Sequence, residues 1–314
     1  MLHRFVLHND RIREASEPGL SPGQVGLLSG WGVFTTIRVA DGVLFAFDRH
    51  WARISRDAAA LHVPLPTGPE NVRRQLLGLV EANNARNSTL RLVIVRNTGS
   101  MWAGPSTGRP ADLIALTADS KEWGVAVKLA YVADARHAAN PFSGAKILSW
   151  AFNLTWVEQA QARGLDEVIL LNEHGHVAEC TSANIFAAVG NQVWTPPLSA
   201  GCLPGITREL LLGEVHVPGI ELIEKDLTPS DLESADEVFI TSTTRNLLPV
   251  CEIERKKVGR ADRVRAALSA AFGAYVSRYV AGHGTTPGKL EVEEASKKSS
   301  KSESARSALL HSDS

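Results

Sequence analysis

The chain has 314 residues, of which 44% are hydrophobic and 21% charged, and its formal net charge at pH 7 is −1. This composition is ordinary for a globular protein with room for two domains, and the balanced charge gives no reason to expect nucleic acid as a partner. No stretch approaches the roughly 18 apolar residues of a membrane span, and the first residues, MLHRFVLHNDRIRE, lack a long apolar core behind a basic start. We therefore expect a cytoplasmic protein without a membrane segment.

The cysteines and the closest histidine pair give no indication of disulfides or metal ions. Cys180, Cys202 and Cys251 are far apart and form no CxxC pair, so they define neither a disulfide framework nor a zinc site. His174 and His176 lie in the stretch NEHGH, which a hairpin turn explains better than metal ligation. We predict no metal.

The first part of the chain is predicted to form a sheet with two helices. Apolar alternation and turn residues predict strands, which lie within 2–12, 32–47, 89–96 and 112–118. Helical spacing of apolar residues predicts a helix over 48–61 with Asp48 as its N-cap, and a second helix over 71–82. A smaller N-terminal α/β domain would then span residues 1–118.

Between two of these strands lies the sequence NTGSMWAGPSTGRP, residues 97–110. It contains several Gly and Pro residues and is too long for a tight hairpin turn, so we interpret it as a substrate-gating loop. We place the interdomain boundary at residues 119–122, before the next predicted strand.

The remaining chain is predicted to form a larger, strand-rich domain over residues 123–282. One of its helices is expected at 147–164, directly after Lys146. A second is expected after Gly205, where the stretch GCLPGITRELLL passes from a loop into a helix, and a third from Asp262 to about Val280. Its strands are expected at 125–133, 166–173, 175–180, 184–189, 192–196 and 237–244. Residues 283–314 are polar and low in complexity, which predicts a disordered tail. The order of strands and helices is typical of an α+β fold rather than of regular βαβ winding.

Separate segments carry groups that suit a phosphate. Arg53 lies on a predicted helix, the loop LPGITR leads into a helix whose first amides belong to Ile206 and Thr207, and Ser242 and Thr243 end a strand. A helix N-terminus favours an anion, and a guanidinium and hydroxyls add donors. Taken singly, these groups are explained as a solvated arginine, a helix cap and a turn. Their co-occurrence favours a phosphate site.

Lys146 and Glu179 are candidates for the two ends of one cofactor. Lys146 stands between the small residues SGA and the apolar ILSW, which would desolvate its ammonium and lower its pKa towards that of a nucleophilic amine. Glu179 lies in the apolar context VAEC, where a buried carboxylate needs a cationic partner such as a protonated pyridine nitrogen. Alone, they are explained as a surface lysine and a structural salt bridge. With a phosphate site, the pair indicates pyridoxal phosphate.

The sequence resembles the fold type IV pyridoxal phosphate enzymes, which include branched-chain aminotransferases, D-amino-acid transaminases and aminodeoxychorismate lyases. The resemblance covers about residues 1–280 and depends on motifs in a fixed order: HWAR at 50–53, Lys146, ECTSANIF at 179–186, GITR at 205–208, and TSTT at 241–244 ahead of Pro249 and Val250. It implies a site between a small and a large domain and a homodimer. By this resemblance, Lys146 is the catalytic Schiff-base lysine, Glu179 is the pyridine-nitrogen partner, and the phosphate ligands are Arg53, Ile206, Thr207, Ser242 and Thr243.

The resemblance leaves the substrate residues less defined, because several positions depart from the family pattern. The stretch SGWG carries Trp31 in place of a motif whose tyrosine often faces the substrate, and Trp150 stands where a tyrosine often binds the cofactor hydroxyl. Arg96 matches a family arginine near the substrate carboxylate. Arg245 stands where transaminases often carry a small residue. The candidate substrate residues are Trp31, Thr35, Arg96, Trp150 and Thr244.

The resemblance implies an aminotransferase that moves an amino group between a small amino acid, branched-chain-like or of D configuration, and a 2-oxo acid. The triplet Phe34-Thr35-Thr36 looks more like aminodeoxychorismate lyases, so 4-amino-4-deoxychorismate lyase, which releases pyruvate and 4-aminobenzoate, is the alternative. A further alternative is a non-catalytic protein with the same fold. That hypothesis predicts a missing lysine or carboxylate, whereas Lys146 and Glu179 are both present.

Overall fold

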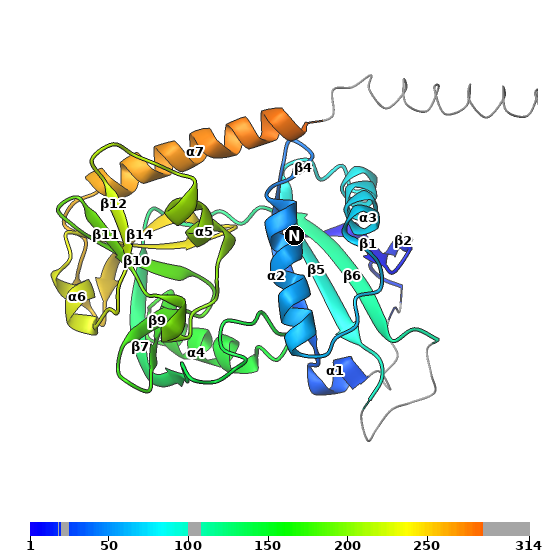
Figure 1. Ribbon diagram of the computed structural model, residues 1–314, viewed down its shortest axis with the longest axis horizontal. Helices are drawn as coiled ribbons and strands as arrows, with labels where there is room; N and C mark the ends of the chain where they lie inside the picture. The colour runs from blue at the N-terminus through cyan, green and yellow to red at the C-terminus, as the bar shows by residue number, and fades with distance from the viewer. Residues whose placement is uncertain (18, 20–24, 100–107, 285–314) are drawn as a thin grey trace, which may run out of the picture.

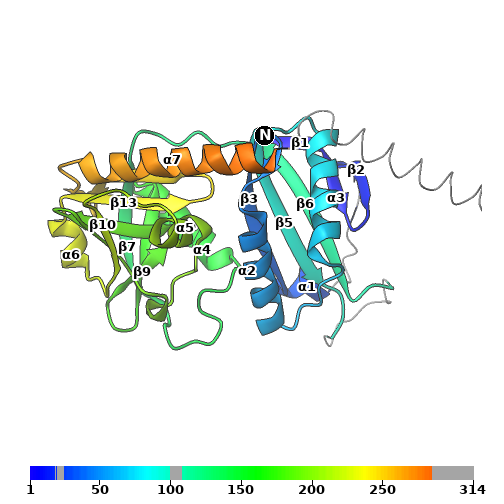
Figure 2. The ribbon, with the colours of Figure 1, turned by 45° about the horizontal axis from the view of Figure 1, so that its top comes forward.

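The computed structural model describes residues 1–17, 19, 25–99 and 108–284. Over these residues the chain forms two domains, each built on one sheet. Helix α7 (Arg263–His283) runs along the second domain and reaches the first with its C-terminal part (Figure 1 and Figure 2). The first domain is smaller and the second is richer in strands. The predicted two-domain α+β fold is confirmed.

The N-terminal domain contains a six-stranded antiparallel sheet in the order β2-β1-β6-β5-β3-β4. Its strands are β1 (Leu2–His8), β2 (Arg11–Glu14), β3 (Gly32–Ala40), β4 (Val43–Leu44), β5 (Ser88–Arg96) and β6 (Ala111–Asp119). Helices α2 (Phe47–Ala60) and α3 (Pro69–Ala82) pack on the sheet, and the short helix α1 (Val25–Ser29) precedes β3.

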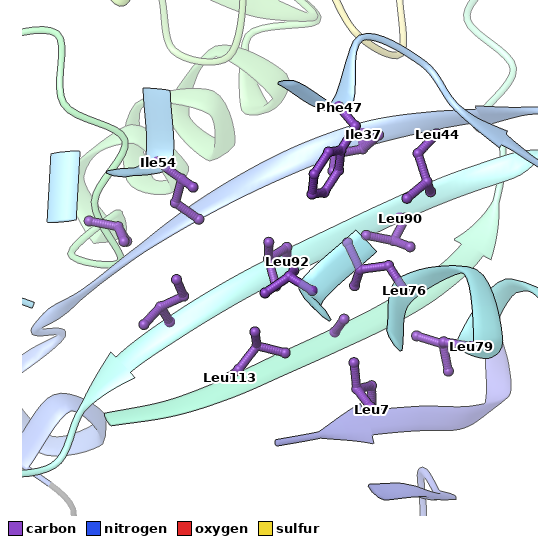
Figure 3. Packing of buried hydrophobic residues seen from close by; sticks show 14 of the residues in the cluster. Leu7, Ile37, Leu44, Phe47, Ile54, Leu76, Leu79, Leu90, Leu92 and Leu113 are labelled. Carbon is purple, nitrogen blue, oxygen red and sulfur yellow. The ribbon is translucent and has the colours of Figure 1, made fainter. Parts of the chain in front are cut away.

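Strand alternation gives this sheet two different faces. Ile37 of β3 and Leu90 and Leu92 of β5 are buried against Ile54 of α2 and Leu76 of α3 (Figure 3). Because successive side chains of a strand point to opposite faces, residues of the other parity on β3 and β5 turn away from the helices. That second face is directed towards the C-terminal domain.

Helix α2 begins one residue earlier than the sequence predicts. Its N-cap is Ala46, whose φ of 54° is left-handed, and Asp48 makes no capping hydrogen bond but binds Arg73 of α3. The prediction of Asp48 as the cap was wrong because Phe45 packs on α7 while Phe47 enters the core of the N-terminal domain. The chain has to turn sharply between these two aromatic residues.

The C-terminal domain contains a nine-stranded sheet in the order β12-β11-β10-β13-β14-β7-β8-β9, with β15 paired to β14. Its strands are β7 (Val127–Arg136), β8 (Glu167–Asn172), β9 (Val177–Cys180), β10 (Asn184–Val189), β11 (Gln192–Thr195), β12 (Glu221–Glu224), β13 (Glu237–Ser242), β14 (Asn246–Ile253) and β15 (Lys256–Lys257). Its other elements are α4 (Ala151–Ala162), η1 (Leu198–Ala200), α5 (Ile206–Gly213) and α6 (Pro229–Ser234).

The contacts between the domains include an aromatic cluster and a pair of salt bridges. Phe45 packs edge-on against Phe272, Tyr275 and Tyr279 of α7, with ring centroids 5.0 to 6.4 Å apart. On α2, Arg49 forms ion pairs with Glu209 of α5 and with Glu214, the residue that follows that helix. The aromatic contacts bury apolar surface, so they stabilise the interface more than these surface ion pairs do.

The segment that carries Lys146 is extended rather than helical. The Lys146 carbonyl accepts a hydrogen bond from Phe34 N (3.0 Å), Ile147 forms an isolated bridge with Val33, and Leu148 N donates to Gly32 O (3.0 Å). Helix α4 starts only at Ala151. The prediction of a helix directly after Lys146 was wrong because the backbone groups of this segment pair with β3 instead.

The predicted domain limits, 1–118, 119–122 and 123–282, stay predictions. The last strand of the first sheet ends at Asp119, and the first strand of the second begins at Val127. Most of the predicted gating loop (100–107) and of the predicted tail (285–314) lies outside the described residues. None of the described helices has the length and apolar character needed to span a lipid bilayer.

Candidate active site

A cavity of about 530 Å³ lies between the two domains. It is lined by all residues predicted to bind the cofactor, from α2, the Lys146 segment, β9, α5 and the end of β13, and also by Trp150 and Thr244. The predicted cofactor residues come from both halves of the sequence. The fold therefore brings them to one place.

Arg53 enters this cavity from α2 as a buried cation. Its Nη1 donates to Pro204 O (3.2 Å), its Nη2 donates to Thr35 Oγ1 (2.9 Å), and its Nε has no partner. Burial lowers the pKa of Arg53 to about 10, although the carboxylate of Asp57 acts in the opposite direction. The guanidinium remains charged at neutral pH without a paired carboxylate among the described residues, which favours an anionic ligand.

His50, Thr35 and Arg53 form a chain of side-chain hydrogen bonds. Thr35 is fully buried, and its Oγ1 is 2.7 Å from His50 Nδ1 while it accepts a hydrogen bond from Arg53. Burial, together with the charges of Arg53 and Lys146, holds the pKa of His50 well below its usual value of 6.5. The imidazole is therefore neutral near pH 7, which avoids a second charge beside the guanidinium.

The amide groups of Ile206 and Thr207 begin helix α5, which follows Gly205 as its N-cap. Amides of a first helical turn have no partner within the helix, and the helix dipole favours an anion there. Asn184 holds the preceding loop by donating from Nδ2 to Leu203 O (2.8 Å), and a Cβ on residue 205 would lie 2.0 Å from Asn184 Oδ1. Glycine is required at this position by that close approach.

Lys146 is held against aromatic rings inside the cavity. Its Nζ lies 4.5 Å from the ring centroid of Phe34 and 5.7 Å from that of Trp150. Burial and the neighbouring charges of Arg53 and Arg91 lower the pKa of Lys146 to about 7, although Glu179 raises it. A substantial fraction of this lysine is therefore a free amine at neutral pH, as a nucleophile or proton acceptor requires.

Glu179 lies on β9, and its carboxylate is bonded on both oxygens. Oε1 accepts a hydrogen bond from Arg136 Nε (3.1 Å), and Oε2 accepts one from Leu203 N (3.0 Å). Each carboxylate oxygen has room for a further donor. These bonds fix the carboxylate at the cavity wall, where it can accept a hydrogen bond from a cationic ring nitrogen.

The structure does not place Trp31, Thr35 or Arg96 in this chain's cavity. Trp31 Nε1 donates to Leu61 O (2.8 Å), and Arg96 stacks on Trp31 (4.1 Å) while donating to His62 O (2.5 Å). Thr35 and Arg96 have the strand parity of the residues under the helices, which directs them away from the cavity.

Strand parity also identifies two cavity residues that the sequence analysis missed. Thr36 of β3 and Arg91 of β5 are register partners on the cavity side of the sheet. The Arg91 guanidinium lies 4.0 Å from the Phe34 ring centroid, and burial lowers the pKa of Arg91. The signal was present in the alternating stretch LRLVIV, in which the leucines define the opposite, buried face.

Arg245 and Trp123 form another part of the wall that the sequence analysis did not assign. Arg245 is ion-paired with Glu167 (3.1 Å), donates to Ser182 O and Oγ, and lies 3.9 Å from the Trp123 ring centroid. Glu167 also accepts hydrogen bonds from Thr181 and Ser182. This buried network joins the turns after β9 and β13 to the segment between the domains. Trp123 belongs to no motif, and Arg245 stood out in the sequence only as a departure from the family pattern, so the three-dimensional arrangement is what places both in the wall.

The combined donor set fits pyridoxal phosphate. A buried arginine without a carboxylate partner, a helix N-terminus and two hydroxyl residues suit its phosphate, and a lysine with a pKa of about 7 and a fixed carboxylate suit its aldehyde carbon and ring nitrogen. Within the described ranges, no group of three or more His, Cys, Asp or Glu side chains is placed to hold a metal ion. The site geometry is that of a pyridoxal phosphate enzyme.

Comparison with known proteins agrees with this geometry. Residues 32–253 match the family model described as amino-transferase class IV. The chain is 32% identical to D-alanine aminotransferase of Bacillus licheniformis, over 81% of this chain and 90% of the relative. The crystal structure of the branched-chain aminotransferase from the archaeon Thermoproteus uzoniensis superimposes with a TM-score of 0.80 at 26% identity, covering 88% of this chain and 97% of that one.

A second solved structure, the branched-chain amino acid aminotransferase from Escherichia coli, shares the fold with a TM-score of 0.79 at 24% identity, over 87% of this chain and 94% of that one. The fold and the site thus define a pyridoxal phosphate enzyme of fold type IV. The chain belongs to the class IV aminotransferase family, whose members transfer amino groups with this cofactor.

Proposed function

We propose that the enzyme transfers an amino group between a small amino acid, branched-chain-like or of D configuration, and a 2-oxo acid. The single observation that carries the proposal is Lys146, an amine with a pKa of about 7, in one cavity with Arg53 and Glu179. The relatives act on D-alanine or branched-chain amino acids according to their names, which supports this substrate class.

The residues that line the cavity would have separate roles in binding the cofactor and in moving the proton. Arg53, the amides of Ile206 and Thr207, and the hydroxyls of Ser242 and Thr243 would hold the phosphate, and Glu179 would accept a hydrogen bond from the protonated ring nitrogen. When bound, pyridoxal phosphate supplies an aldehyde carbon that reacts with amines and a ring that takes up the electron pair of a cleaved Cα–H bond. Lys146 would accept the α proton at Nζ and return it, while Phe34 and Trp150 exclude water from that nitrogen.

The substrate carboxylate would be bound by Arg91. Its guanidinium lines the cavity, and no carboxylate is paired with it in the described part of the chain. Thr36, its register partner, and Thr244 add hydroxyls, and Trp150 adds an apolar wall. Arg96, the sequence-based candidate for this role, is engaged with Trp31 and two backbone carbonyls outside this cavity.

A lyase activity that releases pyruvate and 4-aminobenzoate from 4-amino-4-deoxychorismate is the second candidate. The observation that favours it is Thr36, whose side chain lines the cavity on the same strand as Phe34. A hydroxyl at this point could donate a proton to a leaving oxygen. A non-catalytic protein is disfavoured because both Lys146 and Glu179 face the cavity.

A homodimer and a cytoplasmic location are part of the proposal. Large apolar side chains are exposed beside the cavity, with Phe152 77% and Leu154 57% accessible, and Leu27 and Leu28 of α1 are exposed as well. Exposed apolar surface of this kind is typical of a protein interface. The three cysteines are free thiols, which fits a reducing compartment.

The first experiment asks whether Lys146 bonds the cofactor. The purified protein with pyridoxal phosphate should absorb visible light, and borohydride should bleach this absorbance and attach the cofactor to Lys146. Lys146→Ala should abolish both, whereas Lys128→Ala, which removes an exposed lysine, should change neither. A protein that stays colourless with added cofactor would refute the enzyme assignment.

The second experiment separates the two activities. L-leucine, D-alanine and 4-amino-4-deoxychorismate are each supplied with and without 2-oxoglutarate, and keto acid formation is followed. Aminotransfer requires the acceptor. Pyruvate release without an acceptor supports the lyase instead.

A further inference from the structure

Asp57 is a fully buried carboxylate that the proposed reaction does not use. It lies four residues after Arg53 on α2, so both side chains project from the same side of that helix, and it is 1% exposed. A carboxylate at such a position is destabilising unless its oxygens are hydrogen-bonded. Its partners therefore indicate why it is there.

One partner of Asp57 is the backbone of the catalytic lysine. Asp57 Oδ2 accepts a hydrogen bond from Lys146 N (3.0 Å), across the boundary between α2 and the extended segment. Oδ1 accepts two bonds from its neighbour Arg56, from Nε (3.0 Å) and from Nη2 (2.5 Å). All the bonding of this carboxylate is thus directed at Lys146 and at Arg56.

Arg56 binds the same segment at Gly144, two residues before Lys146. Its Nη2 lies 3.4 Å from Gly144 O, to which it donates while it pairs with Asp57. Gly144 has a φ of 76°, and a Cβ there would lie 2.8 Å from Cys202 O, so the chain turns sharply just before Lys146. Arg56 and Asp57 therefore fix the segment at both ends of this turn.

Strand β3 fixes the opposite side of Lys146. The Lys146 carbonyl accepts from Phe34 N, and the next backbone donor, Leu148 N, reaches Gly32 O. The N–H and the C=O of Lys146 thus have partners on different elements of the N-terminal domain, the N–H on α2 and the C=O on β3. A backbone held in this way allows Nζ only the motion of its own side chain.

We propose that Asp57, with Arg56 as its partner, is a positioning residue that sets the backbone of Lys146 and so aims its amine into the cavity. The catalytic meaning of this anchor rests on the proposed role of Lys146. Through the hydrogen bond from Lys146 N to Asp57, helix α2 contributes to the cofactor site at two places. Arg53 would bind the phosphate, and Asp57 would position the lysine. The anchor also makes the position of the lysine depend on how the two domains pack.

The direct test is amide hydrogen exchange of the full chain, with and without pyridoxal phosphate. In the unsubstituted protein the Lys146 amide should be protected to the same degree as that of Leu148. Asp57→Ala should accelerate exchange at Lys146 by about tenfold, the loss of one hydrogen bond, while Leu148 stays protected. Asp57→Asn keeps an acceptor oxygen and should retain most of the protection. Asp48→Ala is the control, since Asp48 lies on the same helix and binds Arg73.

A kinetic readout distinguishes positioning from a structural role. Asp57→Ala should lower kcat and slow the attachment of pyridoxal phosphate to Lys146, with little change in the KM of the amino donor, and Asp57→Asn should restore both. A Lys146 amide that exchanges freely in the unsubstituted protein would overturn the proposal even if Asp57→Ala fails to fold. So would equal protection in Asp57→Ala. An inactive but protected protein would refute the proposed function and leave the anchor intact.

Discussion

The two walls of the cavity balance their charges differently. On the N-terminal-domain wall, Arg53 and Arg91 have no paired carboxylate among the described residues. On the C-terminal-domain wall, Arg136 is paired with Glu179, and Arg245 is paired with Glu167. The unpaired guanidinium groups of the cavity therefore come from the N-terminal domain, whereas the arginines of the C-terminal wall are neutralised by carboxylates of the same domain.

This difference suggests separate roles for the two pairs of arginines: the unpaired ones bind anions, and the paired ones fix the shape of the cavity wall. Two anionic groups, the phosphate of the cofactor and the carboxylate of the substrate, match the two unpaired guanidinium groups in number and sign. The paired arginines contribute less to anion binding because their charge is already compensated, but they fix turns and aromatic rings around the cavity. The following substitutions test whether the two walls can be perturbed separately.

The largest effect is expected at the Arg245–Glu167 pair. Arg245→Met leaves the buried Glu167 carboxylate without its cation, which should lower the free energy of unfolding by about 3–5 kcal/mol. The double variant Arg245→Met/Glu167→Gln removes both charges and should recover much of that loss. Urea unfolding of the apoproteins measures both values. A double variant as unstable as the single one would show that the charge balance of this wall does not matter.

Arg53→Met should weaken cofactor binding without a comparable loss of stability. Hydrogen bonds to a charged group contribute about 1.5–3 kcal/mol, so the Kd for pyridoxal phosphate should rise roughly 10- to 100-fold. Arg49→Met is the matched control, because Arg49 lies on the same helix but pairs with Glu209 and Glu214. Equal effects of the two substitutions would contradict a specific role of Arg53.

Arg91→Met should act on the substrate alone. Loss of one charged contact to a carboxylate should raise the KM for a 2-oxo acid about tenfold, while the Kd for the cofactor stays unchanged. Arg96→Met, on the same strand but of opposite parity, should leave both constants near those of the unsubstituted enzyme. If Arg96→Met raised the KM and Arg91→Met did not, Arg96 rather than Arg91 would bind the substrate carboxylate.

The smallest effect concerns His50 and depends on pH. Because the pKa of His50 is held well below 6.5 in the folded protein, the unfolded chain binds more protons once the pH falls below about 6.5. The unfolding free energy should therefore decrease with falling pH, by at most about 1.4 kcal/mol per pH unit from this residue. His50→Gln should flatten that dependence in the apoprotein. His62→Gln, which removes an exposed histidine, should leave the slope unchanged.

The residues chosen from motifs as cofactor ligands all line the cavity between the domains, although their roles stay predictions. Arg53, Glu179 and the start of α5 lie inside local patterns whose backbone geometry is set by nearby residues, as Asn184 and Gly205 illustrate. The fold class followed from the same local signals. Local alternation separates the two faces of a strand, but it does not show that the less apolar face is directed towards another domain.

The sequence-based choice of substrate residues was incomplete for that reason. Thr35 and Arg96 were chosen by their position in motifs, but strand parity directs them towards the helices, while Thr36 and Arg91 face the cavity. Trp123 comes from a segment without periodicity, and only packing places it on Arg245. The extended backbone at Lys146 depends on pairing with β3, a partner more than a hundred residues earlier in the chain.

The contact of Phe45 with α7 has a consequence for the order in which the protein can be completed during synthesis. Phe45 leaves the ribosome with the first domain, but Phe272, Tyr275 and Tyr279, the rings that enclose it, lie in α7 and are translated much later. Domains generally fold as units, the N-terminal one first. The N-terminal domain therefore exposes the side chain of Phe45 until α7 has been translated. The contact between Phe45 and the second domain can form only after α7 has emerged.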